Sequence, residues 1–100
     1  MNEILRQVCE RLVATAAPLG VLLYAQKETP CGSTLREASF CLIVEGDAAA
    51  IERRIYRELD LDFPYNLLVY TAKDWETLSA DPTSYVTSIR RKGVLLYGKA

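Results

Sequence analysis

Residues 40–70, FCLIVEGDAAAIERRIYRELDLDFPYNLLVY, decide the fold because they encode a strand, a helix and a further strand in that order. The apolar run 40–44 is typical of a strand that is covered on both faces. Gly46 and Asp47 form a turn, and Asp47 is well suited to cap the helix that follows. A stripe of apolar residues predicts the buried side of this helix: Ala48, Ile51, Ile55 and Leu59. The run 65–70 is then predicted to be a strand.

Two elements and a loop precede this unit. Apolar residues at every fourth position predict a helix from Glu3 to about Ala17, which Pro18 ends. The run 21–24, VLLY, predicts a strand without alternation. Residues 25–36 have no such pattern and are rich in turn formers, so they are predicted to be a loop.

Three elements follow the central unit. Residues 71–78 predict a short helix whose start, a threonine followed three positions later by an aspartate, resembles a capping box. Asp81 followed by Pro82 predicts the start of another helix, and Gly93 is suited to end it. The run 94–97, again VLLY, predicts a last strand.

The order of these elements predicts an α/β (α+β) fold. We expect a small mixed sheet of about four strands that is covered by helices. One hundred residues correspond to a single domain, 1–100. Half of the residues are hydrophobic (50%), which is enough for one core.

Composition excludes several classes of function. Lys plus Arg number 12 and Asp plus Glu 13, so the net charge of −1 gives no strong nucleic-acid signal. The sequence has no histidine, which excludes Ser-His-Asp and Cys-His catalysis and histidine-containing zinc sites. The apolar runs are far shorter than the roughly 20 residues that span a bilayer, and the sequence does not begin like a signal peptide. Cys9, Cys31 and Cys41 form no CxxC pair, so a reduced, cytoplasmic protein is expected.

The residues alone do not assemble a complete catalytic set. The sequence contains neither GxGxxG nor a P-loop motif. The pair Gly32-Ser33 is interpreted as a turn, and the basic segments 53–57 and 90–92 as solvated helix faces.

Four stretches in this order match the pattern of a known family: 19–24, LGVLLY; 40–44, FCLIV; 65–75, YNLLVYTAKDW; and 84–97, SYVTSIRRKGVLLY. Their order and apolar pattern resemble the minimal nucleotidyltransferases of the DNA polymerase beta superfamily, which often stand beside HEPN-domain proteins in toxin–antitoxin pairs. The resemblance covers nearly the whole chain and implies a nucleotidyltransferase-like fold. In that family a Gly-Ser pair follows the first strand, an Asp-x-Asp lies on the second and a third acid lies on the next. Together these residues hold a nucleotide and Mg²⁺.

Two of the positions that match this family pattern lack the family's residues. Ala25 and Gln26 stand where the resemblance implies the Gly-Ser pair, whose backbone N–H groups approach the triphosphate closely. Asn66 stands at the position of the third acid and is a neutral, poorer ligand for Mg²⁺.

The Asp-x-Asp position has two alternative alignments. Alignment by strand pattern places Ser39 and Cys41 there, whereas counting from Ala25 without gaps places Glu37 and Ser39 there. Neither alignment restores the pair of acids that would align an attacking hydroxyl with the α-phosphate through Mg²⁺.

The resemblance and these departures together predict a catalytically degenerate domain that needs no cofactor and acts by binding. The bound molecule is expected to be a partner protein, or else a nucleotide that is held weakly without turnover. With a HEPN-type partner the resemblance implies an antitoxin-like role by occlusion. The alternative is an active, Mg²⁺-dependent nucleotidyltransferase that transfers NMP to a protein or small molecule, with Glu37, Glu45 or Asp47 rebuilding the metal site. A third interpretation is an interaction module unrelated to this family. The sequence leaves the oligomeric state open, a homodimer included.

Overall fold

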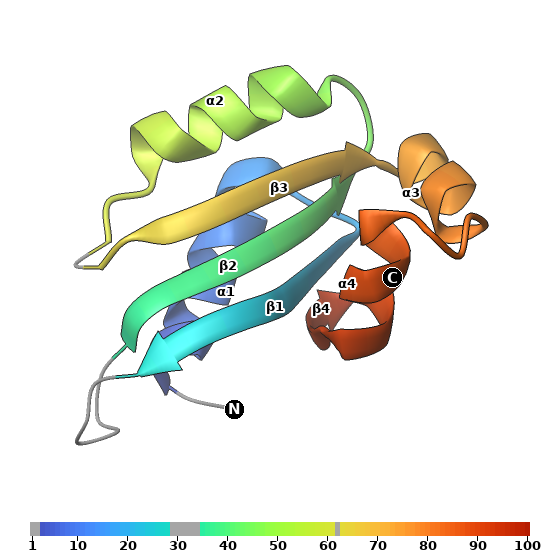
Figure 1. Ribbon diagram of the computed structural model, residues 1–100. Coiled ribbons are helices and arrows are strands. Elements are labelled where there is room, and N and C mark those ends of the chain that lie inside the picture. Colours follow the sequence, from blue (N-terminus) through green and yellow to red (C-terminus); the bar gives the residue numbers. More distant parts are fainter. Residues whose placement is uncertain (1–2, 29–34, 62) are drawn as a thin grey trace.

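The computed structural model describes residues 3–28, 35–61 and 63–100. These residues form α1 (Glu3–Ala16), β1 (Gly20–Glu28), β2 (Leu35–Val44), α2 (Ala48–Glu58), β3 (Tyr65–Thr71), α3 (Ala72–Ser79), α4 (Tyr85–Lys92) and β4 (Val94–Gly98), in that order (Figure 1). The predicted fold class is confirmed, because the described residues form an α+β domain of four helices and a mixed four-stranded sheet.

The sheet has the strand order β3-β2-β1-β4. β1 is antiparallel to both of its neighbours, whereas β2 and β3 are parallel. A parallel pair needs a connection that returns the chain to the same end of the sheet, and α2 provides it. β4 and β3 are therefore the two edges of the sheet.

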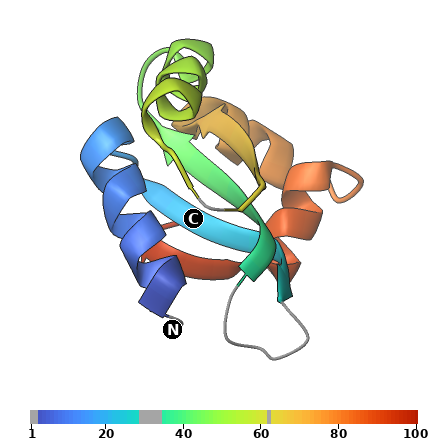
Figure 2. The ribbon, with the colours of Figure 1, turned by 90° about the vertical axis from the view of Figure 1, so that its left-hand side faces the viewer.

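Helices cover both faces of this sheet. Figure 2 shows α1 and α2 on one side and α3 and α4 on the other. Residues 40–44 of β2 are continuously apolar because successive side chains of a strand point to opposite faces, and helices cover both faces of this sheet. Phe40 and Leu42 join the core under α1 and α2, whereas Cys41 and Ile43 join the core under α3 and α4.

Two predicted helix caps are present. The Asp47 side chain accepts a hydrogen bond from the backbone N–H of Ala50 at 3.1 Å. The Thr71 hydroxyl accepts one from the backbone N–H of Asp74, also at 3.1 Å. Each cap satisfies a donor that the first helical turn leaves without a partner. No helix in the described part of the chain has the length and apolar character that crossing a membrane requires.

The predicted loop at 25–36 is wrong at both of its ends. β1 continues to Glu28 and β2 already begins at Leu35. Backbone pairing between the two strands extends past their apolar parts, and an ion pair joins Lys27 to Glu37 across them. These residues form strands because they pair with the neighbouring strand, although their local sequence has no strand pattern. Residues 29–34 of the predicted loop, which include Cys31, Gly32 and Ser33, lie outside the described residues.

The predicted start of the last helix is also wrong. α4 begins at Tyr85, and Ser84 rather than Asp81 is its cap. The Asp81 carboxylate instead accepts hydrogen bonds from the backbone N–H and the hydroxyl of Thr83, at 2.9 and 2.7 Å. An aspartate that bonds two residues ahead makes a turn as readily as a cap, and only the surrounding packing selects between them.

Candidate functional site

Three of the positions singled out by the family resemblance meet in one row across the sheet. Ala25 of β1 lies opposite Ser39 of β2, and Ser39 lies opposite Asn66 of β3. These residues come from three separate stretches of sequence, and the pairing register brings them together.

An irregularity in β1 shapes this row. Leu23 pairs with Phe40 and Ala25 pairs with Ser39, so Tyr24 is an extra residue on the β1 side. An extra residue of this kind is a β-bulge, which bends the strand and redirects its side chains. Tyr24 packs beside the core under α3 and α4, next to the row.

Polar side chains in and beside the row bind one another. We call the set Lys27, Glu37, Ser39 and Asn66 the polar row. The Asn66 side-chain amide donates to the Ser39 hydroxyl at 3.1 Å and to the Glu37 carboxylate at 3.0 Å. The ammonium of Lys27 lies 3.5 Å from the other carboxylate oxygen of Glu37. The one carboxylate of the polar row therefore already has an amide donor and a cation as partners.

Cys41 lies on the same face of β2 but inside the core. Its side chain is buried (0% exposed), and it pairs with Leu22 on one side and Leu68 on the other. Burial raises the pKa of this thiol to about 12. Mg²⁺ prefers oxygen ligands, so a buried thiol is a poor substitute for an aspartate at this position.

The donor set of the polar row does not fit Mg²⁺. This ion prefers carboxylate oxygens in octahedral geometry, and the row offers one carboxylate, one hydroxyl and one amide. Within the described ranges, no group of three or more cysteine, aspartate or glutamate side chains is placed to hold a metal ion. Glu45 and Asp47 follow the far end of β2, and Asp47 caps α2, so they do not join Glu37.

The position of the family's Gly-Ser pair offers little room. Ala25 and Gln26 line a cavity of about 70 Å³ together with Lys27, Glu37 and Ser39. Sites for small molecules and cofactors usually enclose roughly 300 Å³ or more. The cavity that the described residues form here is therefore much smaller than a typical cofactor site.

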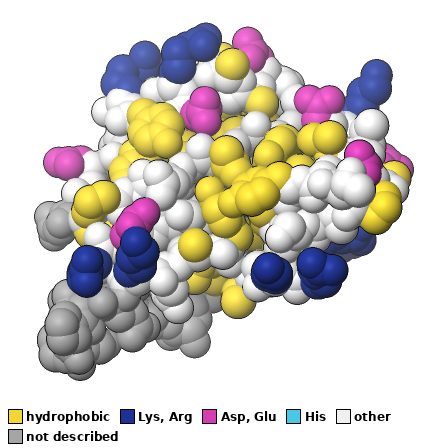
Figure 3. Space-filling model, in the orientation of Figure 1, with side chains coloured by type: hydrophobic (Ala, Val, Ile, Leu, Met, Phe, Trp, Pro, Cys, Tyr) yellow, Lys and Arg dark blue, Asp and Glu magenta, His cyan; other side chains and the backbone are white. Residues whose placement is uncertain are grey.

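Aromatic side chains beside the polar row were not predicted as a group. Tyr24 and Tyr85 meet edge to face, with ring centroids 6.2 Å apart, and help to line a cavity of about 260 Å³. Burial, with a smaller contribution from Tyr85, raises the pKa of Tyr24. Figure 3 shows hydrophobic side chains at the centre of this face, with lysine and arginine side chains nearer its outline. No local sequence signal links Tyr24 to Tyr85, because only the fold brings α4 to β1.

β4 is an exposed edge of the sheet. Four large apolar side chains lie on or beside it and are about half exposed, and we call them the β4 edge: Leu19, Val94, Leu95 and Tyr97. A mainly apolar cavity of about 290 Å³ lies next to it, between α1 and β4, and includes Cys9, Val13 and Leu96 in its lining. Sequence analysis predicted the strand but not its exposure.

No protein-family model, curated protein or solved structure matches this chain.

Proposed function

We propose that this protein is a catalytically degenerate, minimal nucleotidyltransferase-like domain that acts by binding a partner protein. In the form that the family resemblance implies, the partner is a HEPN-type protein and the role is antitoxin-like, by occlusion. The observation that carries the binding function is the β4 edge: β4 pairs with β1 on one side only, no described strand pairs with its other side, and large apolar side chains are exposed on it.

The polar row supports the non-catalytic part of the proposal. Nucleotidyl transfer through Mg²⁺ requires carboxylates that neutralise the metal and align the attacking hydroxyl. Ser39 and Asn66 stand in the row without such charges, and the Glu37 carboxylate is bound by Asn66 and Lys27. Recruiting Glu37 to a metal would therefore break two existing interactions.

The β4 edge supports the binding part. An edge strand presents unpaired backbone N–H and C=O groups, and proteins usually protect such edges with charged residues, proline or a covering segment. Val94, Leu95 and Tyr97 offer no such protection. An extended segment of a partner can pair with the backbone of β4 and place its own apolar side chains against these residues.

The first prediction concerns metal and nucleotide. We expect no Mg²⁺- or Mn²⁺-dependent incorporation of labelled nucleotide into the protein or its partner. We also expect no rise of the thermal midpoint on titration with Mn²⁺, because a bound ion would stabilise the folded state by linkage. Thermal unfolding of the wild type and of Glu37→Gln measures this. Robust labelling, or a Mn²⁺-induced rise that Glu37→Gln removes, would contradict the proposal.

The second prediction concerns the β4 edge. Val94→Lys is expected to weaken capture of a co-expressed HEPN-type partner at least about tenfold, because it places a charge on apolar contact surface. Val94 is 58% exposed, so the free energy of unfolding should change by no more than about 0.5–1 kcal/mol. Co-purification followed by a titration of the purified proteins measures the effect.

Tyr56→Lys is the matched control for Val94→Lys. Tyr56 is also about half exposed, but it lies on α2 and stacks on Tyr65, away from β4. The Tyr56→Lys variant should bind the partner with the same affinity as the wild type. Equal weakening by both variants, or failure of the wild type to co-purify with the partner, would count against the proposed function.

A further inference from the structure

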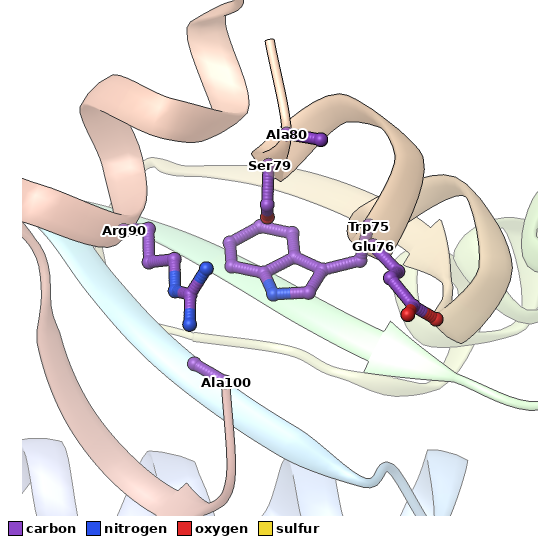
Figure 4. Close-up of a pocket in the computed structure, with 6 residues that line it drawn as sticks. All are labelled: Trp75, Glu76, Ser79, Ala80, Arg90 and Ala100. Atoms are coloured by element: carbon purple, nitrogen blue, oxygen red, sulfur yellow. The ribbon is translucent and has the colours of Figure 1, made fainter. Parts of the chain in front are cut away.

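A cavity of about 370 Å³ lies between α3, α4 and the last residue of the sequence. Its lining residues are Trp75, Glu76, Ser79, Ala80, Arg90 and Ala100. None of them belongs to the polar row or to the β4 edge. Figure 4 shows Trp75, Ser79 and Arg90 directed toward one another. We propose that this cavity binds a small organic monocarboxylate.

Two donors beside this cavity have no partner. The Trp75 indole N–H and the Ser79 hydroxyl are the buried side-chain polar groups without a hydrogen bond among the described residues. Trp75 itself is only 5% exposed. Buried polar groups are nearly always hydrogen-bonded, and leaving one unpaired is unfavourable. That both belong to one cavity indicates a missing acceptor there.

The charge beside these donors is also uncompensated. None of the ion pairs in residues 3–28, 35–61 and 63–100 includes Arg90. Glu76 lines the same cavity, but Figure 4 shows its carboxylate pointing away from the guanidinium. The residues that line the cavity thus include one cation and two residues with unpaired donors, and Glu76 lies at its side.

This set of groups selects the class of ligand. A carboxylate carries acceptors only, so its oxygens can receive hydrogen bonds from indole, hydroxyl and guanidinium together. A guanidinium also binds a carboxylate through two parallel hydrogen bonds. One cation near Glu76 disfavours a dianion such as phosphate, and Arg90 repels an amine. The indole and the alanine side chains provide an apolar wall for the body of the acid.

The chain provides its own probe, because Trp75 is its only tryptophan. The indole N–H gives a single cross-peak in a ¹H–¹⁵N spectrum of the labelled protein. We expect acetate, butyrate or benzoate, added at constant ionic strength, to move this cross-peak downfield in a saturable manner. Sodium chloride, sodium phosphate and butylamine should not.

Two variants complete the experiment. Arg90→Gln should weaken binding of the same acids about ten- to a hundredfold, because it removes a charged hydrogen bond. Arg91→Gln is the control: Arg91 is also exposed on α4 but does not line the cavity. Thermal unfolding of each variant checks that it is folded. No saturable shift with any of the acids, saturation by phosphate alone, or equal weakening by both variants would overturn the proposal.

Discussion

Replacing Cys41 with aspartate is expected to unfold the domain or nearly so. The substitution reinstates an acid at one of the Asp-x-Asp positions implied by the family resemblance, but the side chain there is fully buried between Leu22 and Leu68. A carboxyl group without a partner in such a place destabilises by about 4 kcal/mol or more. That is a large part of the roughly 5–15 kcal/mol that stabilises a domain of this size. Urea denaturation followed by circular dichroism measures the loss.

Cys41→Ala provides the comparison for the aspartate variant. It removes the sulfur without adding a charge, so the expected loss is within about 0.5–3 kcal/mol. Burial holds the pKa of the introduced carboxyl above its unfolded value of about 4, so its folded form keeps a proton that the unfolded form releases. The stability difference between the two variants should therefore grow as the pH rises above about 4 and shrink below it. Equal stability of both variants at neutral pH would show that this position tolerates charge, as a metal site would.

The second large effect is expected at Gly20, where β1 and β4 approach each other closely. A Cβ atom at this position would lie 2.0 Å from the carbonyl oxygen of Lys99, which is far inside contact distance. Gly20 pairs with Gly98, and the Lys99 N–H donates to the Leu19 carbonyl at 3.1 Å beside it. Gly20→Ala should force this end of β4 away and destabilise the domain by about 2–3 kcal/mol. Denaturant midpoints and hydrogen exchange of the β4 amides measure the two effects.

Gly46→Ala is the control for this steric argument. Gly46 has a φ of +94°, but nothing lies within 4 Å of the Cβ that alanine would add. Its expected loss of about 1 kcal/mol comes from backbone strain alone and should leave β4 protected from exchange. If Gly20→Ala also weakens capture of the HEPN-type partner while Gly46→Ala does not, the result supports β4 as the binding surface. Equal loss of stability in both variants would contradict the steric explanation.

Most elements could be predicted because their signals are local. The stripe from Ala48 to Leu59 and the caps at Asp47 and Thr71 depend on residues within a few positions of one another. The predictions failed where pairing with a distant segment decided the outcome. The extension of β1 to Glu28 depends on β2, and no pattern within residues 25–28 indicates it. The prediction that Asp81 caps the last helix failed for a related reason. Its local sequence fits a turn and a helix cap equally well.

The proximity of the candidate positions came only partly from the sequence. The family resemblance singled out Ser39, Cys41 and Asn66, and the parallel pairing of β2 with β3 sets Ser39 beside Asn66. Nothing in the sequence indicated that Lys27 would bind Glu37. The sequence also did not distinguish Ser39, which is buried and hydrogen-bonded to Asn66, from Cys41, which lies two residues further along the same face in a hydrophobic cluster. Residues of α3 and α4 pack in the cluster that contains Cys41, and only the tertiary structure brings them there.

The sequence by itself determined the order of helices and strands, the caps of α2 and α3 and the apolar character of the sheet. Only the tertiary structure decided which strand lies inside the sheet and which at its edge. The two identical pentapeptides GVLLY, at 20–24 and 93–97, show that local sequence does not determine the place of a strand in the sheet. Val21 and Leu22 are buried in a central strand, whereas their counterparts Val94 and Leu95 are half exposed on β4. The physical reason is that identical local preferences make equally good strands, and the position of each is set by long-range pairing and by the helices packed against it.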